Sequence, residues 1–250
     1  MAQNIYDQPA FFAQYSQLPR SREGLAGAPE WPVVRAMLPP LANKRVLDLG
    51  CGFGAFCRWA HEQGAAKITG VDLSEKMLQT ARERGLGLPI DYQQADLAHY
   101  QPDSAGFDLV FSSLAVHYLA DFDALCARLR DGLRAGGGFV FSMEHPIFAT
   151  RATPDWINGD GDNRAWAITD YGKEGERVTN WLADGVVKYH RKLSTCLNSL
   201  LANGFVLDAI EEWTPTSVDL AQNPQLADEI IRPMLLIVGA HKASTITPPA

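Results

Sequence analysis

The chain has 250 residues, 46% of them hydrophobic, and a formal net charge of -7 at pH 7. This size and composition allow one large domain, or one domain with an insert, to bury a full core. The acidic balance offers no basic face for nucleic acid, so no nucleic-acid partner is expected. No apolar run approaches the length that crosses a membrane, and no membrane partner is expected either.

The start of the chain and its four cysteines indicate a cytoplasmic protein. The first residues lack the basic and apolar regions of a secretion signal. The cysteines form no CxxC pair and show no spacing typical of a metal site, so we expect reduced thiols and no bound metal. They are Cys51, Cys57, Cys126 and Cys196.

Residues 1–44 are predicted to be an N-terminal segment that precedes the regular part of the fold. Within it, Phe11, Phe12 and Tyr15 recur at helical spacing, which predicts a short amphipathic helix over residues 9–17. Residues 19–32 are rich in glycine, proline and charge, which predicts a loop.

From Arg45 onward, apolar runs alternate with helical patterns. Strands are predicted over residues 45–49, 67–71, 89–93, 107–112 and 139–143. Helices are predicted over residues 55–63, after Ser74 and after Asp121, because serine and aspartate are preferred N-terminal caps. This alternation predicts parallel βαβ units with helices on both faces, a doubly wound α/β sheet in residues 45–145.

The alternation breaks over residues 146–188, which show no clear period. A segment of that length inside a compact domain is typical of a functional lid, so we expect it to cap the substrate. A helix over residues 189–202 and strands over residues 205–212 and 234–241 are predicted to complete the sheet within residues 189–243. Residues 244–250 are predicted to be a disordered tail.

The first strand ends in a glycine turn that indicates a nucleotide-type cofactor site. Gly50, Gly52 and Gly54 follow the strand directly, and Asp72 ends the next strand. Glycines in such a turn let the backbone approach a ligand and begin a helix whose positive N-terminus faces it. An acid at the end of the second strand is placed to accept hydrogen bonds from a ribose.

Five motifs occur in order along the chain, and together they carry a resemblance. They are the run from Asp48 to Gly54, the acid Asp72, the triplet Ala95-Asp96-Leu97, the strand over residues 107–114 and the glycine loop over residues 133–138. With these motifs the chain resembles the class I S-adenosylmethionine-dependent methyltransferases. The likeness is to the small-molecule group around the ubiquinone-type and type 11 enzymes.

The resemblance implies a seven-stranded sheet whose last two strands form an antiparallel hairpin, and S-adenosyl-L-methionine as cofactor. It places glycines under the methionine and ribose parts, Asp72 on the ribose hydroxyls, and Asp96 on the adenine amine. The cofactor contacts that it implies are Asp48, Gly50, Cys51, Gly52, Asp72, Leu73, Met77, Ala95, Asp96, Leu97, Ser112 and His117.

The N-terminal segment carries a second likeness, to bacterial members with a Tyr-Ser-Gln-x-Pro-Arg-Ser stretch, here residues 15–21. In those proteins this segment is expected to fold over the cofactor. The resemblance therefore makes Tyr15 and Arg20 candidates for the cofactor's sugar and carboxylate. The alternative for Arg20 is an exposed loop charge.

Two other functions fit parts of the same pattern. Gly50, Gly52 and Ala55 also satisfy the relaxed fingerprint of nicotinamide-dependent oxidoreductases, with Asp72 as the ribose acid. The acid Asp48, the third glycine and the Asp96 motif are not needed by a dinucleotide site and favour the methyltransferase. A protein that binds S-adenosylmethionine without transferring its methyl group would carry identical motifs.

Three histidines follow predicted strands or begin a predicted helix near the site. Ligands of open α/β sheets bind beyond the carboxyl ends of the strands, which favours His117 and His145 over His190. Our catalytic hypothesis is that His145, helped by Glu144 or His190, accepts a proton from the methyl acceptor. The alternatives are cofactor contact for His117, a loop-fixing role for His145 and packing at a helix start for His190.

The predicted lid holds Trp156, Trp166, Tyr171 and Trp181, which favours a planar or aromatic small molecule as methyl acceptor. The alternative is that these rings pack the insert onto the sheet. Residues 112–115 lack the Asn/Asp-Pro-Pro-aromatic motif of enzymes that methylate exocyclic amines of bases. The identity of the acceptor, the choice among O, N and C, and a homodimer are left open.

Overall fold

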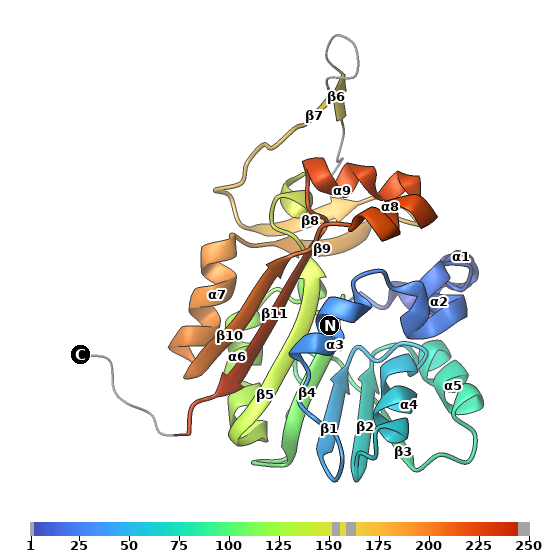
Figure 1. Cartoon of the computed structure of the whole chain (residues 1–250), viewed down its shortest axis with the longest axis vertical. Helices are drawn as coiled ribbons and strands as arrows, with labels where there is room; N and C mark the ends of the chain where they lie inside the picture. Colours follow the sequence, from blue (N-terminus) through green and yellow to red (C-terminus); the bar gives the residue numbers. More distant parts are fainter. Residues whose placement is uncertain (1–2, 152–155, 159–163, 245–250) are drawn as a thin grey trace.

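The computed structural model describes residues 3–151, 156–158 and 164–244 (Figure 1). Its centre is a seven-stranded sheet in the order β10-β11-β5-β4-β1-β2-β3. The strands are β1 (Arg45–Leu49), β2 (Lys67–Asp72), β3 (Ile90–Gln94), β4 (Phe107–Ser113), β5 (Leu133–Glu144), β10 (Phe205–Glu212) and β11 (Leu235–Lys242). Strand β11 alone runs opposite to the other six strands and pairs antiparallel with both β10 and β5, so the predicted fold class is confirmed.

Helices cover both faces of the sheet and create two hydrophobic cores. One core lies under α6 (Phe122–Gly132) and α7 (Leu193–Ala202). The other lies under α3 (Trp31–Met37), α4 (Ala55–Glu62) and α5 (Glu75–Arg84). Because β1 runs parallel to both β2 and β4, the carboxyl ends of these three strands lie at the same edge of the sheet.

Local signals explain why these elements begin where they do. Strand β1 is buried at four consecutive positions, as expected of a strand covered on both faces. Ser74 caps α5 by accepting a hydrogen bond from the Met77 N–H, and Asp121 caps α6 through the Ala124 N–H. Both caps agree with the prediction.

The predicted loop over residues 19–32 is wrong. This stretch forms α2 (Pro19–Glu23), a 3-10 turn (Gly24–Gly27) and the start of α3. Proline suits the first turn of a helix because the missing N–H has no partner there anyway, and α2 and α3 both have proline in that turn. The predicted amphipathic helix exists as α1 (Pro9–Tyr15), with Phe11 fully buried.

The chain between β5 and α7 forms two hairpins. These are β6 (Trp156–Asn158) with β7 (Arg164–Trp166), and β8 (Gly175–Thr179) with β9 (Val186–His190). The helix predicted over residues 189–202 therefore starts too early. The β-branched and aromatic run of β9 pairs with β8, and α7 begins only at Leu193.

Two further differences concern the start of β5 and the connection between β10 and β11. Strand β5 begins at Leu133 and includes the glycines that were predicted to form a turn before it. Between β10 and β11 lie α8 (Ser217–Gln222) and α9 (Asp228–Ile231). Residues 245–250, predicted to be a disordered tail, lie outside the described residues.

Helices and a hairpin cover the edge of the sheet at which the parallel strands end. The N-terminal helices, the β8–β9 hairpin and α8–α9 all gather there (Figure 1). Within the described part of the chain, no helix is both long and apolar enough to span a membrane.

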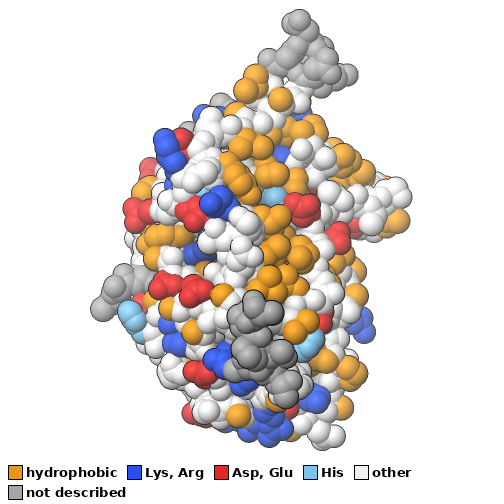
Figure 2. Space-filling view, turned by 90° about the vertical axis from the view of Figure 1, so that its left-hand side faces the viewer, with side chains coloured by type: hydrophobic (Ala, Val, Ile, Leu, Met, Phe, Trp, Pro, Cys, Tyr) orange, Lys and Arg blue, Asp and Glu red, His pale blue; other side chains and the backbone are white. Residues whose placement is uncertain are grey.

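Strand β10 forms one lateral edge of the sheet. Figure 2 shows this side, where hydrophobic side chains lie among charged ones. Val206 and Ile210 on β10 are 44% and 43% exposed. A homodimer stays a prediction.

The variant Phe141→Ala tests how much the packing on β5 contributes to the stability of the fold. The Phe141 side chain is fully buried on β5, with ring centroids of Phe139 and Phe122 at 4.8 and 5.5 Å. We expect Phe141→Ala to lower the free energy of unfolding by ~3–5 kcal/mol, because the cavity cannot be refilled. Urea denaturation would measure this. The control Val206→Ala, on the exposed face, should change the same quantity by less than ~0.5 kcal/mol.

Candidate functional site

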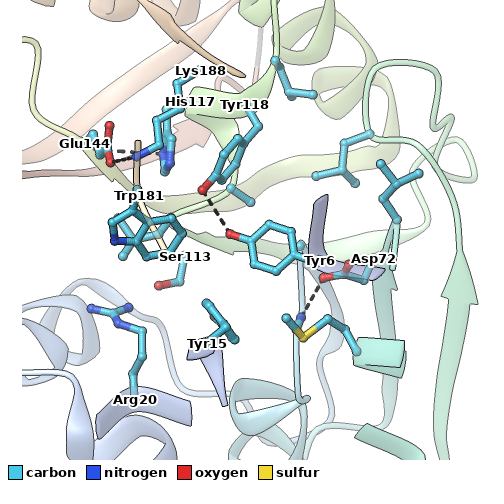
Figure 3. Close-up of a pocket in the computed structure, with 18 of the residues that line it drawn as sticks. Tyr6, Tyr15, Arg20, Asp72, Ser113, His117, Tyr118, Glu144, Trp181 and Lys188 are labelled. Atoms are coloured by element: carbon cyan, nitrogen blue, oxygen red, sulfur yellow. Dashed lines mark hydrogen bonds and ion pairs between the residues drawn. The ribbon is translucent and has the colours of Figure 1, made fainter. Parts of the chain in front are cut away.

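A cavity of about 650 Å³ lies beyond the carboxyl ends of β1, β2 and β4 (Figure 3). Its walls come from these strand ends, from the N-terminal helices and from the segment between β5 and α7. This volume is within the range of small-molecule sites, and the place is where open α/β sheets bind ligands.

The floor of the cavity is the bend after β1. The N–H groups of Gly50 and Cys51 donate to the Val71 carbonyl at 2.8 and 3.0 Å. Gly50 has φ +73°, and a Cβ atom there would lie 2.3 Å from the Ala115 Cβ, so only glycine fits. Gly52 has φ +51° and open space where its side chain would be. A ligand can therefore approach the backbone at Gly52.

Asp72 stands beside this floor at the end of β2. Its Oδ2 accepts from the Gly52 N–H at 2.8 Å and its Oδ1 from the Ser74 N–H at 2.9 Å. Burial raises the pKa of Asp72, and the two N–H donors partly oppose that rise. Each carboxylate oxygen keeps a further lone pair, so Asp72 can also accept from a pair of ligand hydroxyls.

Asp48 lies deeper and is 2% exposed. The Cys57 thiol donates to its Oδ2 at 3.2 Å. Burial raises the pKa of Asp48 to about 7, well above the usual range of an aspartate. Burial also raises the pKa of the neighbouring Cys51 thiol to about 11, which keeps it protonated. Both residues line the cavity.

Most residues that the resemblance assigns to the nucleoside half also line the cavity: Leu73, Met77, Asp96 and Leu97. Ala95 and Ser112 do not. The Ser112 hydroxyl donates to the Leu49 carbonyl at 2.8 Å inside the sheet, whereas Ser113 lines the cavity. Successive side chains of a strand point to opposite faces, so Ser113 faces the cavity and the predicted Ser112 does not.

The N-terminal segment brings Tyr15 and Arg20 to the cavity, as well as Tyr6, which the sequence analysis missed. Arg20 Nη2 donates to Glu30 Oε1 at 2.9 Å, so its charge is paired within the segment. The hydroxyls of Tyr6 and Tyr118 are 3.0 Å apart and form a hydrogen bond across the cavity (Figure 3).

Two contacts hold this segment over the cavity. The Asp7 carboxylate accepts from the Ser74 hydroxyl at 2.5 Å, at the start of α5. On the other side, Gln3 Nε2 donates to the Gly185 carbonyl at 2.8 Å and Gln3 Oε1 accepts from the Val187 N–H at 3.0 Å. The segment thus connects α5 to the β8–β9 hairpin.

A charged and aromatic group lies at the far end of the cavity from Asp72 (Figure 3). Lys188 on β9 donates to Glu144 Oε1 at 2.5 Å, and its Nζ lies 4.9 Å from the Trp181 ring centroid. His117 lies beside this pair, with Nδ1 accepting from the Glu144 N–H at 3.5 Å. Burial lowers the pKa of His117 well below its usual range, and the charges of Lys188 and Arg191 add to this effect. His117 is therefore a neutral imidazole.

The structure does not bring His145 or His190 to the cavity. His145 Nε2 donates to Glu212 Oε1 at 2.7 Å, and its Nδ1 accepts from the Ile147 N–H at 3.1 Å. Both ring nitrogens therefore fix the loop after β5. His190 lies on β9 rather than at a helix start, and its Nε2 donates to the Tyr171 carbonyl at 2.9 Å.

Of the four aromatic residues in the predicted lid, Trp181 lines the cavity. Trp166 stacks on Phe148 with centroids 5.9 Å apart, and the Arg232 guanidinium lies 4.4 Å from its centroid. These rings pack the insert together, as the alternative proposed. Residues 152–155 and 159–163 of the predicted lid lie outside the described residues.

The cavity's donor set suits an adenosyl cofactor better than a metal. Over residues 3–151, 156–158 and 164–244, no three His, Cys, Asp or Glu side chains are grouped to hold a metal ion. An open glycine backbone, an acid for hydroxyls and the apolar side chains of Leu73, Met77 and Leu97 match the parts of a nucleoside joined to an amino acid.

Comparisons with known proteins agree with this geometry. A family model described as a methyltransferase domain matches residues 46–137. An uncharacterised protein of Haemophilus influenzae is 35% identical, over 96% of this chain and 97% of its own. The ubiquinone biosynthesis O-methyltransferase of Idiomarina loihiensis is 28% identical over 73% of each chain.

A solved structure links the chain to a family. The S-adenosylmethionine-dependent methyltransferase from Mesorhizobium loti is 49% identical, with a TM-score of 0.84, over 88% of this chain and 100% of that one. This likeness favours S-adenosylmethionine over a dinucleotide as the cofactor. The chain therefore belongs to the class I S-adenosylmethionine-dependent methyltransferases.

Proposed function

We propose that the protein transfers the methyl group of S-adenosylmethionine to a small planar molecule that shares the cavity with the cofactor. One observation carries this proposal: a single cavity joins the floor at Gly52 and Asp72 to an aromatic end formed by Tyr6, Tyr118 and Trp181. The name of the Idiomarina loihiensis relative, an O-methyltransferase of ubiquinone biosynthesis, supports a small-molecule acceptor.

The cofactor half of the cavity is assigned as follows. Asp72 would accept from the ribose hydroxyls, while Leu73 and Met77 would contact the adenine and Asp96 its amine. The open backbone at Gly52 would lie under the amino-acid part. When bound, S-adenosylmethionine supplies a methyl group on a positively charged sulfur, which is reactive toward a nucleophile placed in line.

Arg20 would face the carboxylate of the cofactor's amino-acid part. Its guanidinium already donates to Glu30, whose side chain is 2% exposed, and this contact holds the arginine in place. Tyr15, also on the N-terminal segment, would lie near the sugar. Both assignments rest on the position of these residues in the cavity wall.

The remaining residues would act by position and by excluding water. Methyl transfer needs mainly a nucleophile held close to the methyl carbon in a dry site, so much of the rate can come from orientation. Tyr6 and Tyr118 would close the cavity with their mutual hydrogen bond. Proton acceptance is assigned to neither His145 nor His190, because both lie outside the cavity wall.

A small acceptor is favoured over a nucleic acid. The net charge of -7 would repel a phosphate backbone, and a cavity of about 650 Å³ admits a small molecule beside the cofactor.

Turnover with planar acceptors tests the proposal directly. The protein would be incubated with S-adenosylmethionine and a panel of phenols, aromatic amines and indoles, with mass spectrometry of the products. We expect a methylated product together with S-adenosylhomocysteine. Tight cofactor binding without any methylated product across the panel would count against transfer to planar molecules and favour a non-catalytic binder.

Asp72→Asn tests the cofactor half. The amide keeps the shape but loses the charge that strengthens hydrogen bonds from hydroxyls, so S-adenosylhomocysteine should bind ~10- to 100-fold more weakly by calorimetry. The control Asp91→Asn changes an exposed carboxylate on the neighbouring strand β3 and should bind normally. An unchanged affinity in folded Asp72→Asn protein would remove Asp72 from the site.

The variant His145→Gln tests whether His145 fixes the loop after β5. Burial lowers the pKa of His145, although Glu212 partly offsets this, so below a pH of about 6.5 the unfolded chain binds a proton that the folded chain does not. Its contribution to stability is therefore present above pH about 6.5 and is lost as pH falls. We expect His145→Gln to reduce the pH dependence of the free energy of unfolding in urea between pH about 7.5 and about 5.5. Cofactor affinity in His145→Gln should stay within ~2-fold, and a large loss would return His145 to the site.

A further inference from the structure

Lys188 is a buried cation whose hydrogen-bonding capacity is only partly used. The residue is 5% exposed, yet it lines the cavity. Its ammonium group has three N–H donors. Among the described residues, Glu144 is its one hydrogen-bond partner, at 2.5 Å. The Trp181 ring, 4.9 Å from Nζ, provides a flat surface beside the charge.

His117 adds a second donor at the same place. Its Nδ1 accepts from the Glu144 N–H, so in the neutral ring Nε2 carries the proton. Figure 3 shows Lys188, His117 and Glu144 grouped at one end of the cavity, with Trp181 next to them. The side chains of Lys188 and His117 thus both supply N–H groups at this end of the cavity.

The charge of this end is also positive. Arg177, which lines the same cavity, donates to the carbonyls of Thr150, Glu176 and Lys173 and is held there as a fixed cation. The Glu144 carboxylate offsets the charge of Lys188, because its Oε1 accepts from the Lys188 ammonium group. Arg151 and the exposed Glu176 also line the cavity, so the charged lining residues between the end of β5 and β9 are three cations and two carboxylates, with a net positive charge.

We propose that the methyl acceptor is an O–H acid, such as a phenol, an enol or a carboxylic acid, bound as its anion by Lys188 and His117 with its plane against Trp181. This inference rests on the proposed function and narrows its substrate class. The acceptor's proton leaves to solvent on binding. An electron pair of the acceptor oxygen then forms the bond to the methyl carbon, while the carbon–sulfur bond breaks and its pair stays on sulfur.

This arrangement needs no histidine base at the acceptor, because Nδ1 of His117 already accepts from the Glu144 N–H and its Nε2 serves as a donor. An acceptor that binds as an anion has already lost its proton, so Lys188 takes over the role of stabilising the deprotonated form. An ammonium acceptor would instead meet the charges of Lys188 and Arg177, and Glu144 is engaged with Lys188. The observations therefore favour oxygen over nitrogen.

The ionisation of a bound chromogenic phenol tests the inference. The protein saturated with S-adenosylhomocysteine would be titrated with 4-nitrophenol at a pH below that phenol's own pKa, and the visible band of the phenolate recorded. We expect the band to grow with bound ligand. The neutral analogues 4-nitroanisole and 4-nitroaniline should bind at least ~10-fold more weakly.

Variants assign the effect to Lys188. Lys188→Met should remove the phenolate band and weaken 4-nitrophenol binding at least ~10-fold. Because this change leaves the half-buried Glu144 without its partner, a double variant, Lys188→Met with Glu144→Gln, removes both charges; it should lose the band and the affinity in the same way. The control Lys67→Met changes an exposed lysine at the start of β2 and should leave the band intact.

Calorimetry with S-adenosylhomocysteine separates the two proposals. Failure to bind it would contradict the cofactor assignment itself. If the cofactor binds normally, any of three results would overturn the O–H acid inference alone. The first is that 4-nitrophenol binds in its neutral form or does not bind, and the second is that 4-nitroaniline binds equally well. The third is an unchanged phenolate band in folded Lys188→Met protein.

Discussion

Three backbone N–H groups connect the bend after β1 to the end of β2, and the geometry of the cavity depends on them. Gly50 and Cys51 donate to the Val71 carbonyl, and Gly52 donates to the Asp72 carboxylate. The same carboxylate also accepts from the start of α5. A single acid therefore fixes a turn, a strand end and a helix start relative to one another, while it still faces the cavity.

Regular elements with strong local signals could be predicted from sequence. Strand β1 has the predicted bounds, and the two caps lie where the short polar side chains of Ser74 and Asp121 precede apolar periodic residues. The five-residue helix α2 could not be predicted in the same way. Its proline and charged residues are equally typical of a loop, and the contacts that fix it come from distant residues, such as the Arg84 guanidinium that donates to the Ser21 carbonyl.

The site was predictable in its residue types but less so in its details. The order of residues in the sequence indicates which ones follow the strands, and most residues predicted to contact the cofactor do line the cavity. The order of residues does not fix the orientation of each side chain. Glu144 and His145 are neighbours, yet Glu144 faces the cavity and His145 fixes a loop. The sequence around Lys188 shows only the alternating pattern of β9 and does not indicate that this lysine lies in the site, because its partner Glu144 is 44 positions away.

Gln3 lies close to the beginning of the chain, and its amide bonds with both Gly185 and Val187 at the edge of the cavity. A purification tag joined at that end would begin within a few residues of these contacts and compete with them. Strand β11 runs the other way: it ends at Lys242, whose ammonium group donates to the Leu133 carbonyl at the start of β5. That end lies on the opposite side of the sheet from the cavity (Figure 1). A foreign peptide attached beyond Lys242 would therefore disturb the cavity less than one attached before Gln3.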